Sequence, residues 1–281
     1  MTQDDGYLLN NRQNEAGRRF DALAALFDPT TFRHLEGLGA GPGRRCWEVG
    51  AGGTSVVSWL AGRVGPTGRV VATDIDTSRL AAAARPPVEV RVHDVGAEEP
   101  PGEDFDLVHA RLVLVHVPDR ERALRSMVKA LRPGGRLLVE DADPALQPLI
   151  CPDEHGPEQR LANRLRQGFR ELLAERGADL AYGRKLPRLL REAGLHEVGA
   201  DAYFPVASPA CTALEAATVR QIRGRLVTAG LATDEDVDRH LANVEAGGMD
   251  LVTAPLVSAW GRKGREPVLR AGAPGGPVTR A

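Results

Sequence analysis

The chain has 281 residues and a mass of 30.1 kDa, and its 36 Lys and Arg nearly balance its 38 Asp and Glu, for a pI of about 6.4. This balance argues against a dedicated nucleic-acid binder, which carries a clustered basic face. No apolar run reaches the roughly 18 residues of a membrane helix, so we expect no membrane association. Three widely separated cysteines and a polar, acidic N-terminus predict a cytoplasmic protein without a secretory signal and without a metal site.

The first forty residues are predicted to be helical. One apolar helical face is formed by Phe20, Leu23, Ala24 and Phe27. The pair Asp28-Pro29 is typical of an N-cap and first helical residue, which predicts a second helix running to Leu35. We therefore expect a helical cap over residues 1–42, built from two helices.

From residue 43 onward, short β-branched runs alternate with helical patterns, which is typical of a parallel α/β sheet. Five strands are predicted in the first part of this region, at Arg45–Val49, Arg69–Thr73, Val88–Val92, Asp106–Ala110 and Arg136–Glu140. Two more are predicted near the end of the chain, at Glu197–Pro205 and Leu256–Arg262. The sequence thus predicts a mostly parallel sheet of seven strands.

Helical patterns also interrupt the second half of this core, which we place at residues 43–263. One lies near residues 153–182 and the other near residues 209–250, and each has an apolar stripe of leucine, isoleucine or valine. The Gly- and Pro-rich segment 264–281 has no periodicity and is predicted to be a disordered tail.

A glycine-rich turn follows the first predicted strand. Gly50, Ala51 and Gly52 lead into a helix that begins near Ser55, so backbone can approach a ligand closely there. A dinucleotide-binding motif would need glycine at position 55, but this chain has Ser55 there, so the turn does not match that motif. Glu48 lies two residues before the first glycine, where it would repel a pyrophosphate and attract an ammonium. The turn predicts a site for a positively charged adenosyl ligand, and the alternative is a purely structural strand–helix turn.

Two later strands also end in acidic residues. Asp74 follows Gly52 by about twenty residues, the separation expected for an acid that binds ribose hydroxyls. Ile75 is placed to pack on an adenine face, and Asp94 ends the next strand, where it could accept a hydrogen bond from the adenine amino group. The alternative for each aspartate is an ordinary helix cap or turn.

These three segments, followed by FDLV at 105–108 and LRPGGRL at 131–137, resemble a class I S-adenosylmethionine-dependent methyltransferase. FDP at 27–29, WEVGAGG at 47–53, HAR at 109–111 and AYGR at 181–184 resemble a bacterial group that methylates small molecules around natural-product pathways. The resemblance extends to Lys263. It implies a Rossmann-like, doubly wound α/β fold with N-terminal helices and helical lid insertions, and S-adenosyl-L-methionine as cofactor.

The resemblance also implies roles for individual residues. Asp74 would bind both ribose hydroxyls, with Ile75 beside the adenine. Asp94 and Val95 would meet the adenine edge. The backbone at Ala110, together with the neighbouring Arg111, would face the methionyl part of the cofactor.

The N-terminal segment of such proteins often closes over the cofactor, which makes Tyr7 and Arg19 candidate ligands. An arginine there could pair with the methionyl carboxylate in a bidentate manner. For Arg19 the alternative is a solvated helix face. Glu48 is expected near the methionyl ammonium or the ribose.

A general base is needed only if the acceptor is a hydroxyl that must lose its proton. His116 follows the fourth predicted strand and is the candidate base, with a structural histidine at a helix end as the alternative. His109 lies within the strand and is predicted to be a core or backbone-bonded residue. Glu140, Asp141 and Asp143 crowd the end of the fifth strand beside the expected acceptor site. Asp141 is the second catalytic candidate, and capping is the alternative.

The predicted function is transfer of a methyl group to a small organic metabolite, with oxygen as the first acceptor atom and nitrogen or carbon as alternatives. Two other functions stay open at this point. One is a different reaction on the same cofactor, such as a cyclisation, and the other is a non-catalytic regulator. For the oligomeric state, we consider a homodimer as one alternative.

Overall fold

A seven-stranded sheet forms the centre of the computed structural model, which describes residues 8–9 and 14–264. The strand order is β3-β2-β1-β4-β5-β7-β6, and β7 runs antiparallel to both of its neighbours. The strands are β1 (Arg45–Val49), β2 (Arg69–Asp74), β3 (Val88–Val92), β4 (Phe105–Arg111), β5 (Leu131–Ala142), β6 (Leu195–Tyr203) and β7 (Leu256–Lys263). The predicted seven-stranded, mostly parallel α/β sheet is confirmed.

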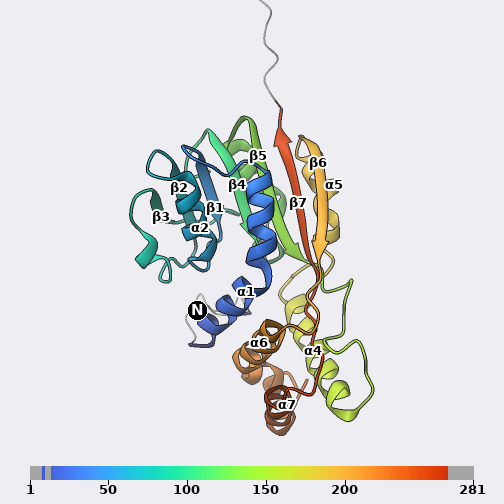
Figure 1. Ribbon diagram of the computed structural model, residues 1–281. Helices are drawn as coiled ribbons and strands as arrows, with labels where there is room; N and C mark the ends of the chain where they lie inside the picture. The colour runs from blue at the N-terminus through green and yellow to red at the C-terminus, as the bar shows by residue number, and fades with distance from the viewer. Residues whose placement is uncertain (1–7, 10–13, 265–281) are drawn as a thin grey trace, which may run out of the picture.

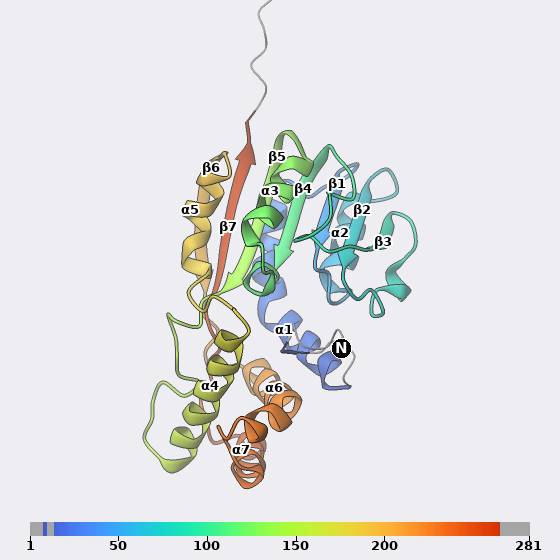
Figure 2. The same ribbon diagram turned by 180° about the vertical axis from the view of Figure 1, so that it is seen from behind.

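Helices cover both faces of this sheet. The helices are α1 (Asn14–Gly37), α2 (Ser55–Val64), α3 (Arg120–Ala130), α4 (Pro157–Glu175), α5 (Leu186–Glu192), α6 (Pro209–Thr228) and α7 (Asp234–Ala246). Figures 1 and 2 show α1 and α2 on one face, and α3 and α5 on the other. None of the helices in residues 8–9 and 14–264 has the length and apolar character needed to span a membrane.

The N-terminal region differs from the expectation of two helices, because α1 is one helix with Pro29 inside it. Proline lacks an N–H and its ring crowds the preceding turn, so a proline within a helix bends it. Figure 1 shows that α1 changes direction along its length. The second half of α1 therefore lies on the sheet, while the first half turns toward the end of β1 and β2.

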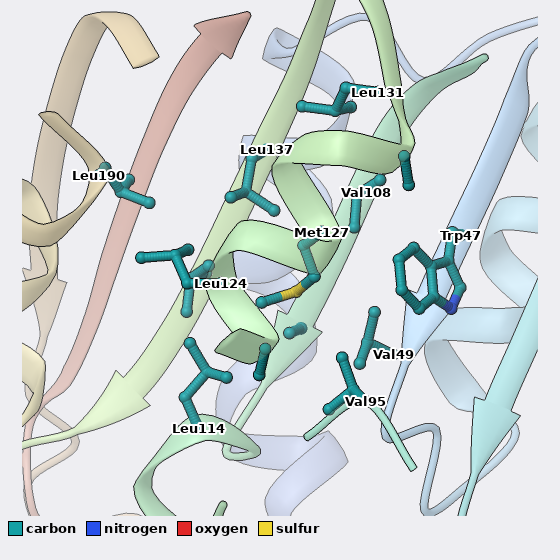
Figure 3. Packing of buried hydrophobic residues seen from close by; sticks show 14 of the residues in the cluster. Trp47, Val49, Val95, Val108, Leu114, Leu124, Met127, Leu131, Leu137 and Leu190 are labelled. Atoms are coloured by element: carbon teal, nitrogen blue, oxygen red, sulfur yellow. The ribbon is translucent and has the colours of Figure 1, made fainter. Parts of the chain in front are cut away.

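The core beneath α3 is apolar and closely packed. Trp47 of β1 lies on one side of it, Val108 of β4 is its neighbour on the sheet, and Leu137 of β5 is the neighbour of Val108 (Figure 3). Leu124 and Met127 of α3 cover these strands, because their spacing of three residues places both on one helical face. Burial of such large side chains supplies most of the stability of the sheet.

The remaining helices gather beyond the carboxyl ends of the parallel strands. The arrowheads of β4 and β5 point toward α4, α6 and α7, which we call the helical lobe (Figure 1). An apolar cluster that includes Leu165 of α4 and Ile222 of α6 holds the lobe together. A second cluster joins it to α1 through Leu26 and Phe27. The lobe and the first half of α1 thus border the sheet edge at which doubly wound folds bind ligands.

Candidate functional site

The glycine turn between β1 and α2 is the first component of the site. Gly50 has φ +63°, and a Cβ atom there would lie 2.4 Å from Cγ2 of Val113. A Cβ atom at Gly52 would lie 2.5 Å from the ring of Phe20, so α1 presses directly on this turn. The Ala51 N–H donates to the Thr73 carbonyl at 2.9 Å and ties the turn to β2. Both glycines are therefore required by close approach, and the first half of α1 covers the turn.

The second component is the end of β2. The Asp74 side chain is buried, and its carboxylate accepts a hydrogen bond from the Asp76 N–H at 2.8 Å. Burial raises the pKa of this carboxyl. The next side chain, Ile75, is 66% exposed although it is large and apolar. A buried acceptor beside an exposed apolar side chain is compatible with the predicted contacts to ribose and adenine, which stay predictions.

The third component follows β3. The Asp94 carboxylate accepts a hydrogen bond from the Gly96 N–H at 2.8 Å and is exposed at the surface. Val95 is buried in the core with Trp47 and Leu114, so its side chain points away from solvent. Only the backbone of Val95 remains for contact with a ligand.

Arg111, a predicted cofactor ligand, has other partners. Its guanidinium lies 2.9 Å from a carboxylate oxygen of Asp28 and donates to the Thr31 hydroxyl at 2.9 Å. Both partners belong to α1, so Arg111 fastens that helix to the end of β4. The adjacent Ala110 is buried and packs in the core. The Arg111 side chain is therefore held by α1, and its contact with the cofactor stays a prediction.

The two N-terminal candidates have different outcomes. Tyr7 lies outside the described residues. Arg19 is only 6% exposed, so the alternative of a solvated helix face is wrong. Its guanidinium carbon lies 4.8 Å from the ring centroid of Phe20, and Phe20 in turn rests on Gly52. Arg19 is therefore close to the glycine turn and remains a candidate for the methionyl carboxylate.

A series of polar side chains crosses the sheet beneath the second half of α1. Nδ1 of His109 lies 2.6 Å from Oε2 of Glu48, and its Nε2 lies 3.3 Å from Oε2 of Glu140. Ser258 donates to Oε1 of Glu140 at 2.7 Å, and Nδ1 of His34 lies 3.3 Å from the same oxygen. We call these five residues, from β1, β4, β5, β7 and α1, the polar row. His109 is thus a buried core residue, as predicted, and its partners are two carboxylates.

The electrostatics of the polar row follow from its alternating charges. Burial opposes protonation of His109, but the carboxylates of Glu48 and Glu140 outweigh it and raise its pKa to about 9. Burial likewise opposes ionisation of Glu140, but hydrogen bonds from His109 and His34 hold the pKa of Glu140 well below its usual range. Burial also opposes protonation of His34, whereas its contacts with Glu140 and Asp201 raise its pKa. The two carboxylates thus favour the protonated form of His109.

Two further acids, Asp141 in β5 and Asp143 directly after it, lie outside the polar row. Asp143 forms a bidentate ion pair with Arg184, at 2.7 and 2.8 Å. Asp141 is fully buried and has no side-chain partner among residues 8–9 and 14–264. Burial raises its pKa to about 8, against the smaller effect of the N–H groups of Leu114 and Val115. An enclosed carboxyl cannot touch an acceptor, which corrects the expectation that Asp141 is catalytic.

His116, the candidate base, lies in a short 3₁₀ turn after β4, from Leu114 to His116. Burial and the positive charges of Arg19 and Arg120 lower its pKa to about 4. The ring is therefore neutral across the physiological range but is a weak proton acceptor. This environment favours a structural role and leaves the catalytic one as a hypothesis.

The sequence did not indicate that Phe20, Thr31 and His34 contribute to the site, nor that Glu48 pairs with His109. The available signal was a set of charged residues, His109 and Glu140, inside strands that are otherwise apolar. Such residues are buried only when paired, so their presence predicts a partner but does not identify it.

Comparison with known proteins agrees with this geometry. Residues 47–139 match the family model of a methyltransferase domain. The chain is 39% identical over 120 residues to UbiE of Vibrio parahaemolyticus, a ubiquinone/menaquinone biosynthesis C-methyltransferase, over 40% of this chain and 46% of that protein. UbiE of Ectopseudomonas mendocina is 36% identical over 125 residues, 42% of this chain and 49% of that protein. The chain spans about half the length of these curated relatives.

Two solved structures show the same fold at low sequence identity. Phosphoethanolamine N-methyltransferase 2 of Haemonchus contortus, bound to S-adenosylhomocysteine and phosphomonomethylethanolamine, has a TM-score of 0.56 and 14% identity, over 92% of this chain and 59% of that one. A putative methyltransferase of Bacillus halodurans has a TM-score of 0.52 and 19% identity, over 83% of this chain and 98% of that one. Sheet order, glycine turn and matched segment converge: the chain carries a methyltransferase domain and has the fold of the class I S-adenosylmethionine-dependent methyltransferases.

Proposed function

We propose that the protein binds S-adenosyl-L-methionine and transfers its methyl group to a small organic acceptor. The observation that carries the proposal is the end of β2, where the buried carboxylate of Asp74 lies beside the exposed side chain of Ile75. The glycine turn of β1 faces the same sheet edge. Asp74 would hold the ribose, Ile75 the adenine, and the turn together with Glu48 the methionyl end.

The work of this chain in the reaction is positioning. The sulfonium of S-adenosylmethionine supplies an already activated methyl group when it is bound, so orientation and exclusion of water can provide most of the acceleration. Phe20 of α1 covers the glycine turn, with Arg19 against its ring, and would exclude water from the methionyl end. The low pKa of His116 supports a mechanism that does not depend on it as a base.

The identity of the methyl acceptor, and of the atom that is methylated, is the more specific part of the proposal. Sequence analysis favoured an oxygen acceptor in specialised metabolism, whereas the curated relatives are named C-methyltransferases of quinone biosynthesis. The family model ends at residue 139, before α4, α6 and α7, so this match does not include the helical lobe. We therefore assign acceptor selection to the lobe, and carry oxygen and carbon as the two acceptor atoms to be tested.

The test has two steps on one purified sample. Mass spectrometry and calorimetry first measure binding of S-adenosylmethionine, for which we expect one site per chain. The protein is then incubated with libraries of phenols, hydroquinones and other small metabolites, and production of S-adenosylhomocysteine is measured. NMR of the product identifies a new O-methyl or C-methyl group. Light scattering of the same sample tests for a homodimer.

Each outcome has a distinct meaning. Absence of binding would overturn the proposal. Binding with formation of S-adenosylhomocysteine and a methylated product supports it. Binding without turnover on any acceptor, or turnover without a methylated product, favours the regulator or the alternative reaction over methyl transfer.

A further inference from the structure

His109 lies close to the candidate cofactor site but cannot touch a ligand itself. Its side chain is only 1% exposed, in the middle of β4. The register of the sheet places it directly beside Glu48 of β1. Any influence of His109 on the cofactor must therefore pass through Glu48.

The contact with Glu48 leaves one carboxylate oxygen available. Nδ1 of His109 lies 2.6 Å from Oε2 of Glu48. The other carboxylate oxygen, Oε1, takes no part in this contact, and the Glu48 side chain is only 5% exposed. Glu48 lies in β1 two residues before Gly50, so we expect a donor that binds in the glycine turn to reach this second oxygen.

The imidazole ring of His109 is itself held from its other side. Its Nε2 faces Glu140, and that carboxylate also receives hydrogen bonds from Thr31, Ser258 and His34. A ring fixed at both nitrogens cannot turn away from Glu48. The polar row thus gives His109 a single orientation in the interior of the sheet.

We propose that His109 is a positioning residue for the cofactor: it fixes Glu48 so that Oε1 accepts a hydrogen bond from the ammonium of the methionyl end of S-adenosylmethionine. The inference rests on the proposed function. It assigns to β4 a share in recognition of the amino-acid end, whereas the ribose and adenine depend on β2. Loss of His109 should consequently affect only ligands that carry the amino-acid end.

The experiment compares two ligands that share adenosine and a thioether. S-adenosylhomocysteine has the amino-acid end, and 5′-methylthioadenosine lacks it. Calorimetry with the full chain measures both affinities in wild type, His109→Leu and His109→Gln. For His109→Leu we expect a loss of about 10-fold or more for S-adenosylhomocysteine and a loss below about 3-fold for methylthioadenosine. His109→Gln retains an N–H donor, so it should recover part of the affinity.

A matched control comes from the helical lobe. His240 of α7 is fully buried, and its Nε2 lies 3.0 Å from Oε1 of Glu215, far along the chain from the glycine turn. His240→Leu removes an equivalent buried histidine–glutamate contact and should change both affinities by the same small factor. In addition, when His109→Leu is combined with Glu48→Gln, affinity for S-adenosylhomocysteine should fall little below that of Glu48→Gln alone, because both residues act through one carboxylate.

Equal losses for the two ligands in His109→Leu, or no loss for either, would overturn the inference. If His109→Leu does not fold, His109→Gln decides: a selective loss of about 3-fold or more for S-adenosylhomocysteine supports the inference, and unchanged or equal effects reject it. If the wild type binds neither ligand, the proposed function fails as well. Wild-type binding with unselective variants rejects the positioning role alone.

Discussion

Asp74 is the residue on which the ribose end of the site depends. Asp74→Ala should weaken binding of S-adenosylmethionine by about 1–3 kcal/mol, because a charged acceptor for two hydroxyls is lost. Asp74→Asn keeps an oxygen for the Asp76 N–H, so the turn is preserved while the charge is removed. Calorimetry on both variants measures the effect. If Asp74→Asn binds as tightly as wild type in a folded protein, the ribose assignment is wrong.

His116 tests whether the reaction needs a base. Because its pKa is lowered to about 4, the ring stays neutral above that pH and takes up protons poorly. We expect turnover of His116→Ala to remain within about threefold of wild type, with no titration near pH 6.5 in either protein. His155 has a 66% exposed side chain and provides the control His155→Ala. A 10²-fold loss specific to His116→Ala would instead make it the general base.

The pairing of Glu48 with His109 could not be predicted from the sequence, whereas other parts of the site could. The glycine turn and Asp74 were predictable because backbone geometry and chain separation carry the signal. The contact between Glu48 and His109 depends on the register of β1 against β4, two strands that are far apart in sequence. A shift of one residue would point His109 to the opposite face, and nothing local in the sequence excludes that shift.

Among the elements, we expect α4 to affect turnover of the acceptor and not binding of the cofactor. Leu165→Ala removes a fully buried side chain from the apolar cluster of the lobe and should lower the free energy of unfolding by about 2–5 kcal/mol. Acceptor turnover should change more than affinity for S-adenosylmethionine. Denaturant unfolding, calorimetry and turnover assays measure the three quantities.

The control for α4 is the same substitution in α2, directly after the glycine turn. Leu60 is also fully buried, and Leu60→Ala should weaken cofactor binding because it loosens the helix that supports the turn. If Leu165→Ala reduces cofactor affinity as much as Leu60→Ala does, the lobe belongs to the cofactor site.

The strands were largely predictable from the sequence, and α1 was not. The run Arg45–Val49 ends directly before Gly50, and Val88–Val92 begins directly after Pro87; both predicted ranges coincide with the observed strands. At Asp28-Pro29 the same local rules failed. Asp28 resembles an N-cap, but its carboxylate pairs with Arg111, and the helix continues through Pro29. A tertiary contact thus overrides a capping signal that is sound on local grounds.

For the whole molecule, the buried carboxyl of Asp141 should make stability fall as pH rises. Its folded pKa of about 8 lies above the ordinary 3.8, so its favourable contribution is complete below pH 3.8 and is lost as pH rises through 8. Asp141→Asn is uncharged at every pH. We expect its melting temperature, relative to wild type, to be about 2–5 °C higher at pH 8 than at pH 5.

Asp143 provides the control for this dependence. Arg184 lowers the pKa of Asp143, so Asp143→Asn should destabilise the protein by a similar amount at pH 5 and pH 8. His109 acts in the same direction as Asp141, because its raised pKa of about 9 means that its contribution is lost between pH 6.5 and pH 9. The prediction would be contradicted if the difference in melting temperature between Asp141→Asn and wild type were the same at pH 5 and pH 8.

The position of β7 between β5 and β6 has a consequence for synthesis on the ribosome. β6 is made before β7 but pairs only with it, so neither can join the sheet until residues 256–263 have emerged. Until then β5 is an open edge that carries Glu140 without Ser258 beside it. An unpaired edge strand invites association with other chains. Nascent chains arrested before β7 should therefore be the stage at which this protein most needs a chaperone.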